Sequence, residues 1–241
     1  MTEFIFMLTS ADETVADALA VYDRVRATQV RYVGFKDIGA SLATLRRLAD
    51  RIREDGRSVV LEVVSETADD ELRSIDIGLG LGVDLLMGGT HPELVLPRLP
   101  RSGVRYLPFC GATSGHPTVL SGTPDQIGDH AGNLTATRGV HGVDLLAYRH
   151  AGDVPAVIDA VVRRSHGPVV VAGSIDRDDR IATVVASGSW GFTVGSAIFS
   201  GAFVPGADYV EQVEHVLRVA AEADERAGPR SGRSWYDPAD I

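Results

Sequence analysis

Cysteine is almost absent from this chain of 241 residues, which has only Cys110. A single cysteine cannot form an internal disulfide, so packing must hold the fold together, and the chain suits a reducing compartment. No apolar run approaches the roughly 20 residues of a membrane-spanning helix. The segment from Met1 to Met7 includes Glu3 and no basic residue, which is not typical of a signal peptide. We therefore expect a cytoplasmic protein without membrane contact.

Positive charge is also scarce. Lysine and arginine total 23 against 33 acidic residues, and the formal net charge is −10. Nucleic acid and anionic membranes repel such a surface, so neither is expected as a partner. An anionic ligand would have to be bound by local groups.

Motifs for metals and nucleotide cofactors are missing as well. The seven histidines are scattered, and no expected strand carries a His-x-His or His-x-Asp pair, so we expect no metal site. The chain has no Gly-x-Gly-x-x-Gly fingerprint for a dinucleotide. We therefore expect no cofactor.

Alternating strand and helix patterns fill the chain. Eight short runs rich in apolar and β-branched residues are each followed by a segment with helical spacing, which is typical of parallel β-α-β units. The runs are residues 4–9, 31–37, 58–65, 84–90, 104–111, 140–149, 168–175 and 191–195. The length and order predict an α/β fold with a single (β/α)8 TIM barrel over residues 1–226 and a tail over 227–241. An open doubly wound sheet is the alternative, but its usual glycine-rich first turn is missing between Leu8 and Glu13.

Several helix starts have recognisable caps. The segments from Ser10 to Glu13 and from Thr123 to Gln126 both fit a capping box, in which the first and fourth side chains satisfy each other's backbone N–H groups. Asp153 and Asp176 are predicted to cap the sixth and seventh helices.

Two consecutive strands end in Gly-Ser, at Gly173-Ser174 and Gly195-Ser196. In many barrels the loops after strands seven and eight bind a phosphate through backbone N–H groups, and glycine lets the backbone approach the anion. A single Gly-Ser would be an ordinary strand end, but the repeat predicts a phosphate-binding site. The pairing of Val-Ala-Gly-Ser-Ile with Thr-Val-Gly-Ser-Ala-Ile resembles the ribulose-phosphate-binding barrel superfamily. That resemblance covers most of the chain and implies a phosphorylated substrate, without indicating an individual family.

Lys36 is the only lysine, and it lies at the end of the second expected strand. Barrel enzymes place their chemistry at this end, and arginine cannot replace an amine that must release a proton. Glu62 lies in the third, neighbouring strand, inside an apolar run where a carboxylate needs a partner. We predict that both face the barrel mouth as catalytic residues; a purely structural ion pair is the alternative. Orotidine-phosphate decarboxylase looks similar here, but its Asp-x-Lys-x-x-Asp arrangement is missing.

Three further residues are candidates for substrate binding: His91 after the fourth strand, His116 after the fifth, and Arg149 after the sixth. Cys110 is interpreted as a packing residue. His130 and His141 are interpreted as structural.

These patterns favour an enzyme that acts on a small phosphorylated sugar or polyol, by proton transfer beside a carbonyl or by C–C cleavage. Such an isomerase, epimerase or lyase would use Lys36 to stabilise an enolate or move a proton, with Glu62 as base or orienting group. One alternative is an aldolase in which Lys36 forms a Schiff base. Another is a non-catalytic sensor of a phosphorylated metabolite. The expected partner is the small substrate, and a homodimer is compatible with the sequence.

Overall fold

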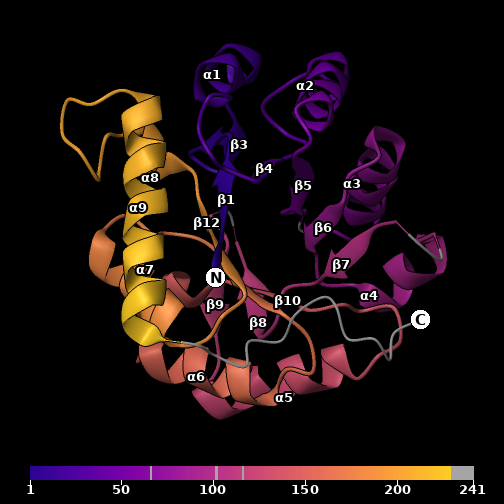
Figure 1. Cartoon of the computed structure of the whole chain (residues 1–241). Coiled ribbons are helices and arrows are strands. Elements are labelled where there is room, and N and C mark those ends of the chain that lie inside the picture. The colour runs from indigo at the N-terminus through magenta and orange to yellow at the C-terminus, as the bar shows by residue number, and fades with distance from the viewer. Residues whose placement is uncertain (66, 101–102, 116, 229–241) are drawn as a thin grey trace.

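The computed structural model describes residues 1–65, 67–100, 103–115 and 117–228. Eight parallel strands form one sheet, in the order β10-β11-β12-β1-β4-β5-β6-β7, and helices surround it (Figure 1). The first and last strands of that order are joined as well, because Asp144 N donates to Pro108 O over 3.0 Å and Cys110 N donates to Asp144 O over 3.1 Å. The sheet therefore closes, and the predicted TIM barrel is confirmed.

Each barrel strand overlaps one of the eight predicted runs. The strands are β1 (Glu3–Met7), β4 (Tyr32–Phe35), β5 (Ser58–Val63), β6 (Leu85–Gly88), β7 (Arg105–Leu107), β10 (Val143–Leu145), β11 (Val169–Val171) and β12 (Gly191–Val194). Two small hairpins lie outside the barrel: β2 (Thr9–Ser10) with β3 (Glu13–Thr14), and β8 (Ala112–Ser114) with β9 (Val119–Ser121).

The outer helices follow the strands in order. They are α1 (Ala18–Val25), α2 (Leu42–Glu54), α3 (Ala68–Leu81), α4 (Pro92–Val95), α5 (Pro124–Thr135), α6 (Val154–Arg164), α7 (Asp178–Ala186), α8 (Ser196–Phe199) and α9 (Tyr209–Ala227). The fourth helical unit is only one turn long and continues as the 3-10 helix η1 (Leu96–Arg98). Pro97 and Pro100 explain its length, because proline lacks the N–H that a continuing α-helix needs.

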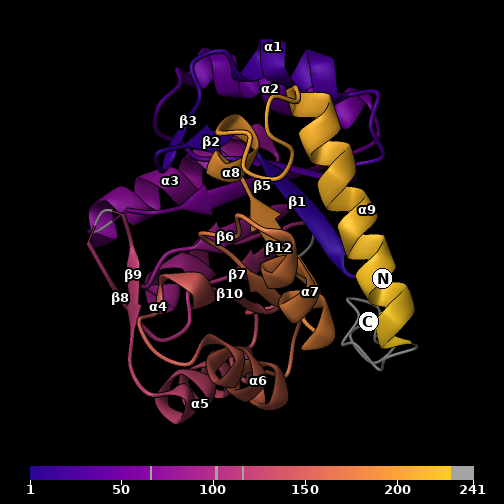
Figure 2. The ribbon, with the colours of Figure 1, turned by 90° about the vertical axis from the view of Figure 1, so that its left-hand side faces the viewer.

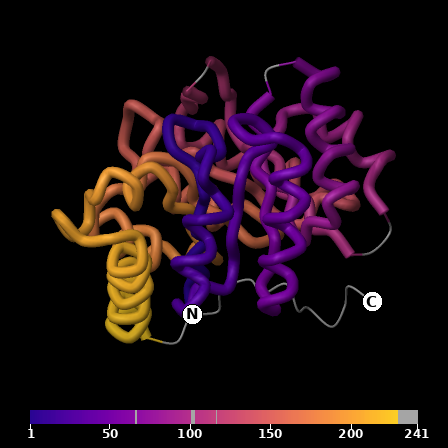
Figure 3. Tube along the Cα trace, turned by 90° about the horizontal axis from the view of Figure 1, so that it is seen from above, coloured from indigo at the N-terminus to yellow at the C-terminus, as the bar shows by residue number. Residues whose placement is uncertain are grey.

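Helix α9 completes the outer ring. It packs against α7 on one side and α1 on the other, and Figures 2 and 3 show it beside the start of the chain. Thr2 N donates to Asp224 Oδ2 over 2.6 Å, which fixes α9 to the residue before β1. Residues 229–241, most of the predicted tail, lie outside the described residues.

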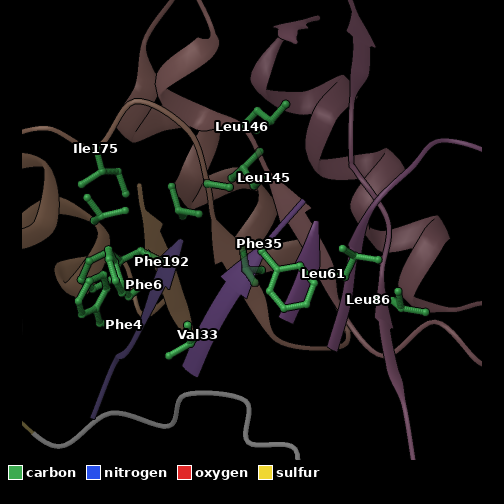
Figure 4. Close-up of a cluster of buried hydrophobic side chains, with 14 of the residues drawn as sticks. Phe4, Phe6, Val33, Phe35, Leu61, Leu86, Leu145, Leu146, Ile175 and Phe192 are labelled. Carbon is green, nitrogen blue, oxygen red and sulfur yellow. The ribbon is translucent and has the colours of Figure 1, made fainter. Parts of the chain in front are cut away.

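Strand side chains alternate between two apolar layers. Those facing the helices form the larger layer, which includes Phe6, Phe35, Leu61 and Leu145 (Figure 4). Those facing the barrel axis form a smaller cluster, namely Ile5, Met7, Val60, Leu85, Met87, Leu107 and Val170. This alternation determines which polar strand residues point into the barrel.

Two predicted helix caps are wrong and two are confirmed. The segment from Ser10 to Glu13 forms a hairpin rather than a helix start, because Ala11 and Asp12 adopt positive φ values of 50° and 65° in a two-residue turn. Helix α7 begins at Asp178 without a side-chain cap, and Asp176 pairs with Arg180 instead. Thr123 forms the predicted capping box, and Asp153 accepts a hydrogen bond from Ala156 N.

Candidate active site

Five ionisable residues gather at the carboxyl ends of the barrel strands. Lys36 follows β4, Glu62 lies in β5, Asp144 in β10, Arg149 ends the 3-10 helix η2 (Ala147–Arg149), and Asp12 lies at the tip of the β2–β3 hairpin. Lys36, Glu62, Asp12 and Asp144 are all buried. Burying this many charged groups costs free energy unless they neutralise one another, so their pairing is the main question.

Lys36 lies between two carboxylates. It points into the barrel because it continues the inward alternation of Tyr32 and Gly34, and its side chain is 2% exposed. Its Nζ donates to Asp12 Oδ1 over 2.8 Å and lies 3.6 Å from Glu62 Oε2. The predicted approach of Lys36 and Glu62 is therefore confirmed.

Local backbone contacts hold Lys36 in place. The Thr14 hydroxyl donates to Lys36 O over 2.7 Å and accepts from Lys36 N over 2.8 Å. This pair of bonds ties the β2–β3 hairpin to the end of β4. The hairpin therefore brings Asp12 to Lys36.

Asp12 is bound by two cations. Arg149 donates to both of its oxygens, over 2.6 Å to Oδ1 and 2.8 Å to Oδ2, which is the bidentate geometry of a strong guanidinium–carboxylate pair. Burial favours the neutral acid, but the hydrogen bonds and charges of Arg149 and Lys36 outweigh it and hold the pKa of Asp12 well below its usual range. Asp12 is therefore ionised at neutral pH.

Arg149 connects this charged cluster to the predicted phosphate loops. Its NH1 also donates to Thr118 O over 3.2 Å, next to β9. On its other side it lies against Gly173, where a Cβ would come 2.7 Å from the arginine Nε. Only glycine leaves room for the guanidinium at that strand end.

Asp144 differs from the other carboxylates of the cluster because no described side chain pairs with it. It is fully buried in β10 and in register with Val170, which faces the barrel axis. Neither of its side-chain oxygens has a hydrogen-bond partner among the described residues. Burial and the nearby Glu62 carboxylate raise its pKa well above the usual range, against the opposing charges of Lys36 and Arg149. Both effects favour the protonated form of Asp144.

The two Gly-Ser segments end adjacent strands. Val170 pairs with Gly191 and Val171 with Phe192, so the register brings both segments to the same edge of the barrel. The backbone of Ser174 adopts a positive φ of 56°, which is uncommon outside glycine, and Arg180 donates to its carbonyl oxygen. Ser196 begins the short helix α8, and both serine side chains are exposed.

Gly195 packs tightly against the segment that follows β1. A Cβ there would lie 2.5 Å from Thr9 Oγ1 and 2.8 Å from Thr9 O. The absence of a side chain therefore lets the loop after β12 lie directly on the segment after β1.

Of the two histidines predicted to bind substrate, His91 lies among the described residues. His91 lies beyond β6, where its Nδ1 shares a hydrogen bond of 2.8 Å with Glu71 Oε2. Glu71 is itself fully buried and accepts from the backbone N–H groups of Thr90 and His91. This arrangement fixes the imidazole and leaves Nε2 as the nitrogen that can face a ligand. His116 lies outside the described residues.

The surroundings of three other side chains fit structural roles. Cys110 is fully buried, and burial raises the pKa of its thiol well above the usual range, as expected for a packing residue. His130 Nδ1 accepts from Gly111 N over 2.9 Å, and His141 Nδ1 accepts from Tyr106 N over 3.2 Å.

Sequence reasoning missed Asp12 and Asp144. Asp12 lies inside the segment from Ser10 to Glu13, whose Ser-x-x-Glu pattern predicts a helix cap and fits a hairpin turn as well. Asp144 had a usable signal: like Glu62, it interrupts an apolar strand, here Val143-Asp-Leu-Leu146. A strand carboxylate flanked by apolar residues on both sides indicates a group that faces the inside of the barrel.

The described residues lack two features that would indicate other functions. No helix in this part of the chain is long and apolar enough to cross a membrane. The same residues include no group of three or more His, Cys, Asp or Glu side chains placed to hold a metal ion.

Comparisons with known proteins show the fold. No protein-family model matches the chain, and no curated protein sequence matches it. Among solved structures, a monomeric form of phosphoribosylanthranilate isomerase from Thermotoga maritima has a TM-score of 0.61 at 13% identity, over 92% of this chain and 100% of that one. The BexX protein of Amycolatopsis orientalis, solved in complex with CysO, has a TM-score of 0.63 at 16% identity, over 97% and 95%. The tryptophan synthase alpha chain of Legionella pneumophila has a TM-score of 0.60 at 12% identity, over 95% and 94%. These likenesses show that the chain shares its fold with these structures.

Proposed function

We propose that this protein is an enzyme that binds a small phosphorylated sugar or polyol and moves a proton, or cleaves a C–C bond, next to its carbonyl group. One observation carries this proposal: the cluster of the buried Lys36 and Glu62 with the half-buried Arg149 lies at the same end of the barrel as both Gly-Ser segments. Structural neighbours that are an isomerase and a tryptophan synthase alpha chain support a metabolic enzyme.

The phosphate would be bound by the segments Gly173-Ser174 and Gly195-Ser196, through backbone N–H groups and the two exposed hydroxyls. Arg149, which lies against Gly173, and His91 would contact the rest of the substrate. Glu62 would take a proton from the carbon beside the carbonyl. The Lys36 ammonium, 3.6 Å from Glu62, would stabilise the negative charge that develops on the carbonyl oxygen.

A Schiff base at Lys36 is less well supported. Its Nζ donates a hydrogen bond to Asp12 and faces Glu62. An amine must lose its proton before it attacks a carbonyl, and two carboxylates stabilise the ammonium instead. Proton transfer is therefore the reaction that the site favours.

A screen for proton exchange tests the proposal. The protein is incubated in D2O with a panel of ketose and aldose phosphates, and NMR follows loss of the carbon-bound proton beside the carbonyl. We expect exchange with at least one compound, and we expect Lys36→Met to slow it by about a hundredfold or more. Arg46→Met, at an exposed position of α2, is the control and should exchange at the parent rate.

Three results would contradict this mechanism. Tight binding without exchange or cleavage would indicate a sensor. A borohydride-stable adduct at Lys36 would indicate the aldolase route. An unchanged rate in Lys36→Met would make the lysine a structural charge.

A further inference from the structure

The carboxyl group of Asp144 is the one feature of the charged cluster that its neighbours do not explain. Asp144 has no exposed surface, and both of its carboxyl oxygens lack a hydrogen-bond partner within the described part of the chain. Proteins rarely bury a polar side chain without a partner, since the lost hydrogen bonds to water are not replaced. A group left in this state within a candidate active site indicates a missing partner.

None of the described side chains around Asp144 supplies that partner. The charged and titratable groups that act on it are Lys36 after β4, Glu62 of β5, Arg149 of η2 and Cys110 after β7. Lys36 and Arg149 are both hydrogen-bonded to Asp12, and Glu62 is a second acid. No described residue therefore satisfies the Asp144 carboxyl group, and an oxygen of a bound ligand could do so.

We infer that Asp144 is a neutral carboxylic acid in the folded protein, and that it donates a hydrogen bond to an uncharged oxygen, carbonyl or hydroxyl, of the bound substrate. This inference rests on the proposed function and narrows its substrate class.

The charge balance of the cluster supports this substrate class. Lys36 and Arg149 already face Asp12 and Glu62, so two cations meet two carboxylates and Asp144 adds no charge. A carboxylate at the reacting end of the substrate would bring an uncompensated negative charge into a buried site. The fitting ligand is a phosphate ester whose second functional group is a ketone, aldehyde or hydroxyl.

The neutral acid also completes a balanced proton transfer. As Glu62 removes a proton from the carbon, the Asp144 proton passes to the carbonyl oxygen, and the electron pair of the C–H bond forms the enediol double bond. Glu62 becomes neutral and Asp144 becomes anionic, so the total charge of the site does not change. Return of a proton from Glu62 to the neighbouring carbon, with Asp144 recovering one from oxygen, completes an isomerisation without any redox partner.

Infrared spectroscopy of the intact protein tests the protonation state without a ligand. With 13C-labelled aspartate, the C=O stretch of a protonated aspartic acid should be present at pH 7. It should vanish in Asp144→Asn and persist in Asp153→Asn, which changes an exposed helix cap. The inference is overturned if the wild type lacks the band or if Asp144→Asn keeps it.

Calorimetry tests the hydrogen bond to ligand, with inorganic phosphate, dihydroxyacetone phosphate and phosphoglycolate as probes. We expect dihydroxyacetone phosphate to bind more tightly than inorganic phosphate. Phosphoglycolate, which has a carboxylate in place of the ketone, should not bind more tightly than inorganic phosphate. Asp144→Leu introduces a side chain of similar size without a hydrogen-bond donor. It should lower the affinity for dihydroxyacetone phosphate by about fivefold to tenfold and leave the affinity for inorganic phosphate unchanged. Asp144→Asn, whose amide can still donate, should retain most of the difference.

The outcomes separate this inference from the proposed function. A wild type that binds the ketone phosphate no more tightly than phosphate overturns the inference, as does an Asp144→Leu protein that binds it like the parent. A wild type that binds no inorganic phosphate overturns the phosphate site of the proposed function, and the infrared result still decides the state of Asp144.

Discussion

Arg149 binds both carboxylate oxygens of Asp12, although the two residues lie 137 positions apart in the chain. The contact joins the hairpin after the first barrel strand to the turn after the sixth, across the barrel mouth. Because Lys36 donates to the same carboxylate, Asp12 binds both the buried Lys36 and the half-buried Arg149.

Asp12→Asn should therefore destabilise the protein by about 3 kcal/mol, the scale for breaking a buried ion pair, because Arg149 and Lys36 lose their shared anion. Urea unfolding at pH 7 measures this change. The control is Asp50→Asn, whose exposed pair with Arg53 should contribute less than about 1 kcal/mol. Equal effects of the two substitutions would mean that the buried pairing adds no stability.

Acid should remove this contribution. The pKa of Asp12 is lower in the folded protein than in the unfolded chain, so the unfolded chain binds more protons in acid. The contribution is complete above the ordinary aspartate pKa of about 4 and is lost as the pH falls below it. The stability difference between wild type and Asp12→Asn should shrink over that acid range.

Asp144 predicts the opposite pH dependence. Its pKa is higher in the folded protein, so folding takes up a proton once the pH exceeds the ordinary aspartate value. The wild type should then lose up to about 1.4 kcal/mol per pH unit from this group as the pH rises toward its folded-state pKa. Asp144→Asn removes the effect, and its stability relative to wild type should rise with pH in urea unfolding series. A relative stability that stays flat between pH 4 and 7 would show that Asp144 ionises normally.

Gly195→Ala should lower the unfolding free energy by about 1–3 kcal/mol, because its Cβ would collide with the backbone and hydroxyl of Thr9. It should also weaken binding of inorganic phosphate. The matched control is Gly80→Ala in α3, where a Cβ meets nothing within 4 Å and alanine should stabilise the helix by up to about 1 kcal/mol. Equal stability changes at the two glycines, measured by urea unfolding, would contradict the close approach at Thr9.

Ser174→Gly should separate stability from binding. Ser174 holds a positive φ, so glycine should relieve strain and raise stability by up to about 1 kcal/mol. Loss of the hydroxyl should weaken phosphate binding several-fold. Ala11→Gly relieves a similar φ of 50° outside the phosphate loops and should leave phosphate affinity unchanged in calorimetry. If Ser174→Gly binds phosphate as well as the parent, the serine does not contact the anion.

The strands, and with them the meeting of Lys36 and Glu62, could be predicted because both follow from local patterns and from the order of strands in a parallel barrel. Asp12 could not be found this way. The residues around it fit a helix cap and a hairpin turn equally well, and its partners, Lys36 and Arg149, are distant in sequence. The ion pairs of Asp12 with these distant residues accompany the hairpin turn rather than the helix cap. A local stretch of sequence around Asp12 does not reveal these pairs.

Because the only lysine is buried, chemical labelling of its side chain can measure local opening of the folded protein. Lys36 is 2% exposed, so amine-reactive reagents have no accessible lysine side chain on the folded barrel. Labelling of Lys36 requires a fluctuation that releases the β2–β3 hairpin from β4. Mass spectrometry can follow acylation of the peptide that contains Lys36. When the hairpin recloses faster than the reagent reacts, the acylation rate measures the free energy of opening at the barrel mouth.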